Sequence, residues 1–385
     1  MRNWRGPRLM LAAVAAASVT LLVSATGPMA LGQVPDVRVG VFGPLTGPAA
    51  ADGNGCLWGA QLAVEQTNAK GGIDGRKISV ASADDQAIPA EGITAVQRLL
   101  TRDRATSLIS CSYSGATRSA APFAQSAKAP MVVSYAVHPE ITRAGNYIWR
   151  VFSVGAIQGN AMAVMAREDG KGTRAAILWV KNDYGESIGT AAAARFAQLG
   201  GQVVFNEPFQ IGDKDFTTMA TKARAANPDV IMIAGYYAEA GLLVPQLRRL
   251  GLNAPIYASD GMSAPKFIEL AGQTAEGMVV SASTDLNSPL FKAFAREFQA
   301  RHRYIPDSVA SHGHDAMLVL IEAMRRGGTT PEGILKGLGM IDKFTGVNGT
   351  IAFTPAREVI TEQSFWKISG GQFVQYKLLP YDKVK

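Results

Sequence analysis

Stretches with the pattern of β-strands alternate with stretches that have the pattern of α-helices, and this alternation restricts the fold more than any other feature. A strand at 37–42 is followed by a helix at 55–70, a strand at 77–83 and a helix at 89–102. Strands and helices in this order build parallel sheets from βαβ units. The further strands are expected at 106–110, 131–134, 175–180, 202–206, 230–234 and 256–258, and the further helices at 116–127, 187–199, 216–226 and 241–250.

Two lobes are the expected organisation of this α/β pattern. The chain has 385 residues, more than a typical single domain, and suits two domains of about 150–200 residues each. The strand–helix order runs through 37–134 and starts again at 175, and segments near 278–284 and 308–326 return to the first lobe. We therefore predict an α/β fold of two Rossmann-like lobes with parallel sheets.

Residues 1–32 have the pattern of a secretory signal peptide. A basic start is followed by an apolar, alanine-rich stretch at 9–23 and then by small residues. Small or aliphatic residues suit cleavage after Ala25 or after Gly32, and we expect the latter because the first strand begins soon afterwards. The apolar stretch has about 15 residues, fewer than the ~20 of a membrane span, so an uncleaved anchor is the weaker interpretation. No cysteine lies near the junction, so we expect a soluble periplasmic protein without a lipid anchor.

The charge of the chain does not indicate a nucleic-acid partner. Three of the positive charges in the formal net charge of +7 are the arginines of the leader, so the rest of the chain carries +4. That excess is modest for some 350 residues, and the sequence contains no basic run of the kind that binds nucleic acid.

Motifs for cofactors, metals and catalysis are incomplete or missing. Glycines at 53–59 mimic a dinucleotide-binding fingerprint, but about eleven residues separate them from the preceding strand, where a tight turn is required. His312 and His314 open an apolar helix, and no further Cys, His or paired acid completes a metal site. The nucleophile elbow, the Walker loop and the zinc-protease motif do not occur. We therefore expect a protein that binds no cofactor and no metal and that is not an enzyme.

The loops that follow the predicted strands are where a ligand is expected. In open parallel sheets, ligands bind beyond the carboxyl ends of the strands. A tyrosine offers an apolar ring and one hydroxyl, which suits a cleft for a small ligand, although each tyrosine could equally pack on its own lobe. These loops hold Tyr113, Tyr135, Tyr184, Tyr236 and Tyr237.

Polar residues in the same loops could bind charged groups of a small ligand. Ser114 stands before the helix at 116–127 as its expected N-cap, where free N–H groups could bind a carboxylate; capping alone is the alternative. Pro122 should kink that helix. Asp260 follows the strand at 256–258 and could accept an ammonium group, or could serve only as a turn residue. Asp52 is a second candidate partner for a cation.

Cys56 and Cys111 are the only cysteines of the chain. Export places them in an oxidising compartment, where a bridge between them would close a loop of about 55 residues and stabilise the fold by roughly 4 kcal/mol. Two buried free thiols are the alternative, because the sequence does not contain the Cα separation that decides between them.

Nine short motifs resemble, in order, those of the periplasmic substrate-binding proteins of branched-chain amino-acid (Leu/Ile/Val) ABC transporters, which have the type I periplasmic binding protein fold. VGVFGPLTGP at 39–48 is similar to the opening strand and loop of that family, and NAKGGIDGR at 68–76 is similar to its "N-x-x-GGI-x-G" stretch. Together the motifs run through nearly all of the mature chain. The others lie at 114–115, 121–122, 129–130, 134–142, 183–185, 235–237 and 275–277.

The resemblance implies two lobes joined by three hinge crossovers that close over one ligand. The first lobe is expected to contain residues 33–154 and 286–350, and the second residues 155–285 and 351–385. The implied function is to capture an amino acid with a branched-chain or other apolar side chain and to deliver it to an ABC permease with its ATPase. The protein itself is expected to be a monomer. A ligand sensor of the same fold is the alternative.

Roles for the candidate residues follow from their positions in the resembling motifs. Ser114 would hold the ligand carboxylate with the backbone of Tyr135, Ala136 and Val137, and Asp260 the α-ammonium. Tyr184 and Tyr236 would close from the second lobe, and Asp52 would lie near the ligand side chain. Val137 replaces the threonine that is usual in amino-acid binders, so amides, urea and aromatic acids are alternative ligands. Cys111 lies where family members have a disulfide, although Cys56 makes a different pairing.

Overall fold

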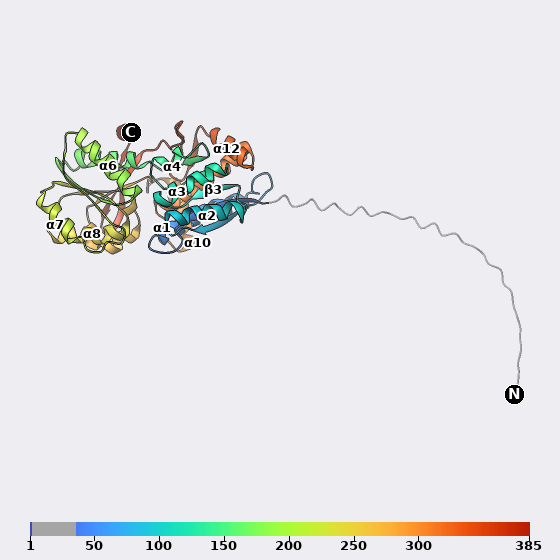
Figure 1. The fold of residues 1–385 in the computed structure, drawn as a ribbon, viewed down its shortest axis with the longest axis horizontal. Helices are drawn as coiled ribbons and strands as arrows, with labels where there is room; N and C mark the ends of the chain where they lie inside the picture. Colours follow the sequence, from blue (N-terminus) through green and yellow to red (C-terminus); the bar gives the residue numbers. More distant parts are fainter. Residues whose placement is uncertain (2–35) are drawn as a thin grey trace. The chain divides into compact units, whose positions relative to one another are not determined.

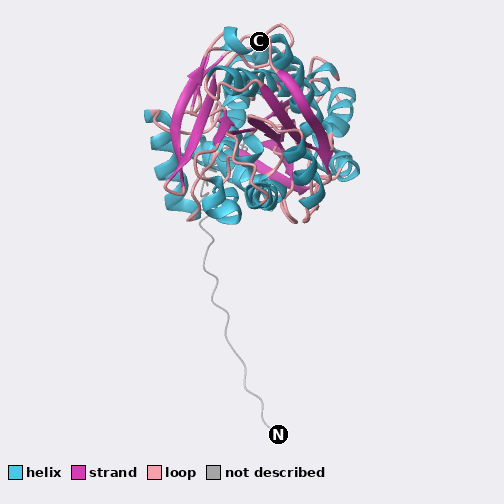
Figure 2. Ribbon diagram, turned by 90° about the vertical axis from the view of Figure 1, so that its left-hand side faces the viewer, coloured by secondary structure: helices cyan, strands magenta, loops and turns pink. Residues whose placement is uncertain are grey.

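A computed structural model describes Met1 and residues 36–385; apart from Met1, the predicted signal peptide lies outside the described residues. Two β-sheets organise this part of the chain, and helices lie along both flanks of the strands (Figures 1 and 2). No helix in the described part is long and apolar enough to span a bilayer.

The first sheet has five parallel strands in the order β2-β1-β3-β4-β5. Its inner strand β1 buries Val37, Val39 and Val41, which alternate along one face of the strand. The strands are β1 (Val37–Gly43), β2 (Ile78–Asp84), β3 (Ser107–Ser110), β4 (Met131–Val133) and β5 (Ile148–Arg150). Helices connect them, namely α1 (Ala50–Ala69), α2 (Pro89–Thr101), α3 (Ser114–Ser126) and α4 (Glu140–Arg143).

The second sheet has seven strands in the order β14-β13-β10-β9-β8-β6-β7. The strands are β6 (Arg174–Val180), β7 (Gln202–Phe209), β8 (Val230–Ala234), β9 (Ile256–Ala258), β10 (Val279–Ala282), β13 (Gln363–Ser369) and β14 (Gln372–Leu379). The connecting helices are α5 (Gly155–Glu168), α6 (Asp183–Gln198), α7 (Thr217–Ala225), α8 (Tyr237–Arg249), η1 (Asp260–Met262), α9 (Pro265–Ala271) and η2 (Gly272–Ala275), and α13 (Tyr381–Val384) follows β14.

The prediction of two α/β lobes with mostly parallel sheets is confirmed, but one edge of the second sheet is antiparallel. β13 runs antiparallel to β10, and β14 antiparallel to β13. Gly370 and Gly371 connect β13 to β14 with φ of 60° and 71°. Two successive residues with positive φ favour a tight hairpin turn, which explains why no helix lies between these strands.

The chain passes between the two sheets three times, at 151–154, 283–288 and 352–362. Between the second and third passages it returns to the first sheet and forms α10 (Pro289–His302), α11 (Ser308–Gly327), α12 (Pro331–Gly339), β11 (Phe344–Gly346) and β12 (Gly349–Ile351). Arg150, next to the first passage, is fully buried and pairs with Glu358 in the third, Nε to Oε2 at 2.8 Å. This ion pair joins two of the passages, and the exact lobe boundaries stay a prediction.

Two helices near the expected ligand site begin earlier than predicted. α1 starts at Ala50 and not at 55. The glycines at its start lie within the helix and allow it to pack closely on the preceding loop, since a Cβ on Gly53 would lie 2.1 Å from the Pro44 carbonyl oxygen. α3 starts at Ser114, so that Tyr113 and not Ser114 is its N-cap. α3 also continues through Pro122 to Ser126.

Candidate functional site

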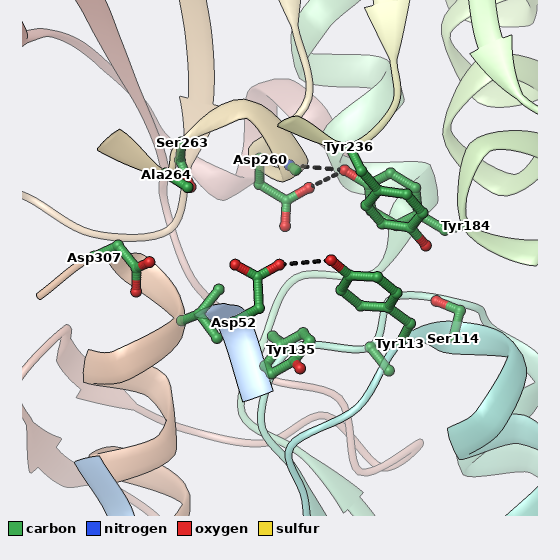
Figure 3. A pocket seen from close by; sticks show the side chains of 13 residues that line it. Asp52, Tyr113, Ser114, Tyr135, Tyr184, Tyr236, Asp260, Ser263, Ala264 and Asp307 are labelled. Atoms are coloured by element: carbon green, nitrogen blue, oxygen red, sulfur yellow. Dashed lines mark hydrogen bonds between the residues drawn. The ribbon is translucent and has the colours of Figure 1, made fainter. Parts of the chain in front are cut away.

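A small cavity lies where the carboxyl ends of strands from both sheets meet (Figure 3). Its volume is about 20 Å³, room for about one water molecule, because side chains fill most of the space. Segments that follow β1, β3 and β4 line it from one side, and segments that follow β6, β8 and β9 from the other. The lining residues are Asp52, Tyr113, Ser114, Tyr135, Ala136, Tyr184, Tyr236, Asp260, Gly261, Ser263, Ala264, Asp307 and Val309.

Stacked tyrosines form one wall of the cavity. The ring of Tyr236 stacks on Tyr113, with centroids 4.2 Å apart, and on Tyr184 at 4.7 Å. Tyr135 meets Tyr113 edge to face. Burial raises the pKa of all four hydroxyls well above the ordinary value, so they remain protonated donors. Because Tyr113 follows β3 and Tyr236 follows β8, the stack joins the two lobes.

Three aspartates face the same cavity. The first turn of α1 contributes Asp52, whose carboxylate accepts a hydrogen bond of 2.7 Å from the Tyr113 hydroxyl. Asp260, at the start of η1, accepts one of 2.6 Å from the Tyr184 hydroxyl. Asp307 is the N-cap of α11, and its Oδ1 accepts from the Ala310 N–H at 2.9 Å. In Figure 3 the carboxyl groups of Asp52 and Asp260 face each other, with Asp307 beside them.

Burial makes these three carboxyl groups unusually weak acids. It raises the pKa of Asp52 from 3.8 to about 7, with a further contribution from the negative charges of Asp307 and Asp260 and an opposing one from the Tyr113 hydroxyl. It raises the pKa of Asp260 and of Asp307 to about 6. Among the described residues that line the cavity there is no lysine, arginine or histidine. The site is therefore suited to a positively charged group.

The residues that were expected to bind the ligand carboxylate contact one another in a way that the sequence did not predict. Ser114 lines the cavity from the first turn of α3, and its Oγ accepts a hydrogen bond of 3.1 Å from the Val137 N–H. Val137 is buried and does not line the cavity, whereas Tyr135 and Ala136 do. The backbone N–H of Val137 is therefore engaged by Ser114. The ligand contacts assigned to these residues stay predictions.

A disulfide joins Cys56 to Cys111, with their Cα atoms 5.7 Å apart. Cys56 lies in α1, and Cys111 directly follows β3. The bridge therefore ties the helix that carries Asp52 to the segment that carries Tyr113. Both cysteines are fully buried.

One of the three acids was not identified from the sequence, and one tyrosine of the same loops lies away from the cavity. Asp307 was not predicted, although an aspartate directly before a helix is a recognisable N-cap signal. Tyr237 does not line the cavity, and its hydroxyl donates to the Pro48 carbonyl at 2.6 Å. His312 and His314 lie inside α11, and no group of three or more potential metal ligands occurs in the described part of the chain.

The fold and the site define a two-lobed α/β binding protein, and comparison with known proteins gives its family. The periplasmic binding protein family matches residues 36–367, and the chain belongs to this family.

Individual relatives are similar over most of their length. An amino acid binding protein of Pseudomonas aeruginosa is 30% identical over 318 residues, 82% of this chain and 78% of the relative. A Leu/Ile/Val-binding protein of Rhizobium johnstonii is 30% identical over 300 residues, 77% of this chain and 81% of the relative. The branched-chain amino acid transporter substrate-binding protein of Streptococcus pneumoniae, solved with isoleucine, has a TM-score of 0.85 at 26% identity and covers 89% of this chain and 99% of its own.

Proposed function

We propose that this chain is the substrate-binding subunit of an ABC importer and captures an α-amino acid between its two lobes, which must separate to admit it because the described cavity has room for about one water molecule. The observation that carries the proposal is the pairing of two complementary features in one cavity. Asp260 offers a half-buried carboxylate for an ammonium group, and Ser114 with the first turn of α3 offers donors for a carboxylate. The names of the relatives support an amino acid, and leucine, isoleucine and valine are the first ligands to test.

The same proposal includes export and delivery. Residues 1–32 would direct the protein to the periplasm and be removed, without a lipid anchor. The lobes, 33–154 with 286–350 and 155–285 with 351–385, would close about the three passages between the sheets. The closed monomer would then dock on a membrane permease that is driven by an ATPase. A sensor of the same fold would share the ligand but not this docking.

An aromatic acid is a less suitable ligand than an amino acid for this cavity. A benzoate-like anion has no cationic group, and it would face the three carboxyl groups of Asp52, Asp260 and Asp307 without a basic residue in the described lining. Repulsion between like charges in a buried site disfavours such a complex.

Titration calorimetry of the purified protein with the twenty amino acids tests the proposal. We expect one or a few to bind near micromolar, about −8 kcal/mol. Asp260→Asn should weaken that binding by at least ~2 kcal/mol, because the ammonium group loses its charged partner. The same change at Asp342, an exposed residue outside the cavity, is the control. Failure of all twenty amino acids to bind would refute the proposal, and recovery of a chemically altered ligand would point to an enzyme.

A further inference from the structure

The cavity contains more negative charge than a simple zwitterionic ligand needs. One carboxylate, Asp260, is sufficient for an α-ammonium group, yet Asp52 and Asp307 line the same cavity from α1 and from the start of α11. No basic side chain of the described lining balances them. Burial of these charges costs free energy unless a cation accompanies them.

Asp307 has a carboxyl oxygen without a partner. Its side chain is buried, with 3% of the residue exposed, and its Oδ1 is used by the N-cap of α11. The Oδ2 atom is buried and makes no hydrogen bond in the described structure. Buried polar atoms are usually satisfied, and Asp307 lines the ligand cavity, so its Oδ2 is placed to accept a hydrogen bond from a ligand.

Tyrosine side chains lie beside the extra acids. The Tyr113 ring carries the hydroxyl that donates to Asp52 and stacks on Tyr236, and Tyr135 lies edge-on to it. Aromatic faces attract organic cations, with a preference for desolvated sites. Tyrosine rings are not metal ligands, and no metal-ligand group of three occurs among the described residues. The surroundings therefore suit an organic cation better than a metal ion.

We propose that the ligand carries a second cationic group, so that the substrate class is α-amino acids with an ammonium or guanidinium side chain. Asp52 and Asp307 bind that group, with the tyrosine rings around it, while Asp260 binds the α-ammonium. The inference rests on the proposed capture of an amino acid. A ligand with a branched apolar chain would leave Asp307 Oδ2 without a donor and two carboxyl groups against hydrocarbon.

Matched ligand pairs test the inference by calorimetry. Lysine and norleucine differ only by the side-chain ammonium, and arginine and citrulline are similar in shape but differ in charge. We expect the charged member of at least one pair to bind at least tenfold more tightly. Equal or tighter binding of norleucine, or preference for leucine over lysine and arginine, would overturn the inference and leave the proposed function intact. Failure of every amino acid would overturn both.

Substitutions of the three aspartates distinguish binding of the side-chain cation from binding of the α-ammonium group. Asp52→Asn and Asp307→Asn should each reduce the lysine-to-norleucine or arginine-to-citrulline affinity ratio at least tenfold, because each removes a charged partner of the side-chain cation. Asp260→Asn should weaken both members. Asparagine preserves an N-cap at position 307, and Asp307→Ser does so as a second variant in case the first does not fold. An unchanged ratio in both the Asp52 and the Asp307 variants would contradict the assignment.

Discussion

At the scale of single residues, burial sets the chemistry of the site. Asp52 lies in the first turn of α1, where it accepts a hydrogen bond from the Tyr113 hydroxyl and lies near Asp260 and Asp307. In these surroundings its pKa rises to about 7. The residue therefore costs the protein stability when it is ionised. Such a cost at a binding site is recovered when a ligand of opposite charge binds.

Asp52 should make the ligand-free protein less stable as the pH rises. Its pKa is about 7 in the folded chain and near 3.8 when unfolded, so between these values the folded state holds more protons and stability falls with increasing pH. At about 1.4 kcal/mol per pKa unit the largest effect is about 4 kcal/mol. Asp52→Asn should therefore raise the free energy of unfolding at pH 8 and leave it nearly unchanged at pH 4, measured by urea denaturation. Asp342→Asn is the control, and an equal effect at both pH values would argue against this account.

At the scale of elements, the packing of α1 against α11 positions two of the three acids. Both helices use glycine at the contact. A Cβ on Gly59 would lie 2.0 Å from the Ala310 carbonyl oxygen, and one on Gly313 would lie 2.2 Å from the Cys56 carbonyl oxygen. The backbones can therefore approach closely enough to hold Asp52 of α1 and Asp307 before α11 at one cavity.

Gly313→Ala should destabilise the protein because its methyl group meets backbone that cannot rotate away. We expect a loss of about 1–3 kcal/mol in the free energy of unfolding, the usual range for overpacking. Gly55→Ala is the matched control in α1, where the nearest atom to the added Cβ is 3.8 Å away. That control should be neutral or stabilising by up to ~1 kcal/mol, because alanine favours a helix. Similar stability for both variants would show that the contact is not tight.

At the scale of the whole described molecule, a few contacts join the lobes around the cavity. Arg118 of α3 binds Asp183 of α6 through two hydrogen bonds, Nε to Oδ2 at 2.7 Å and Nη2 to Oδ1 at 3.3 Å. The Tyr237 hydroxyl reaches the Pro48 carbonyl, and the Tyr113–Tyr236 stack crosses the same interface. These contacts break when the lobes separate, so they favour the closed arrangement.

Arg118→Ala should weaken ligand binding without touching the ligand, because it removes a contact that exists only when the lobes are closed. The pair is partly exposed, so we expect a loss of at most about 1 kcal/mol, roughly fivefold in the dissociation constant. Arg98→Ala removes an exposed ion pair with Asp103 within one lobe and should leave the affinity unchanged. Calorimetry at low ionic strength distinguishes them. Equal affinities of both variants and the parent would show that the Arg118–Asp183 pair does not contribute to closure.

The strands and helices were largely predictable because their signals are local. The alternation of buried and exposed positions and the glycine and proline boundaries lie within short windows, and predicted strands such as 230–234 and 256–258 coincide with β8 and β9. Predictions failed where a distant partner decides the outcome. The glycine-rich start of α1 forms a helix because Gly53 packs against Pro44, and Ser114 enters α3 with its Oγ bound to Val137.

The sequence by itself determined the α/β class, the two-lobed organisation and the loops in which a ligand site was to be sought, because periodicity and turn residues act along the chain. Only the tertiary structure decided that Asp52, Asp260 and Asp307 share one cavity, that Cys56 is bridged to Cys111 and that Tyr237 points elsewhere. These residues come from segments up to about 250 positions apart, and their distances depend on how the helices and sheets pack. Burial and the neighbouring charges, which the sequence does not reveal, then raise the pKa values of these three carboxyl groups.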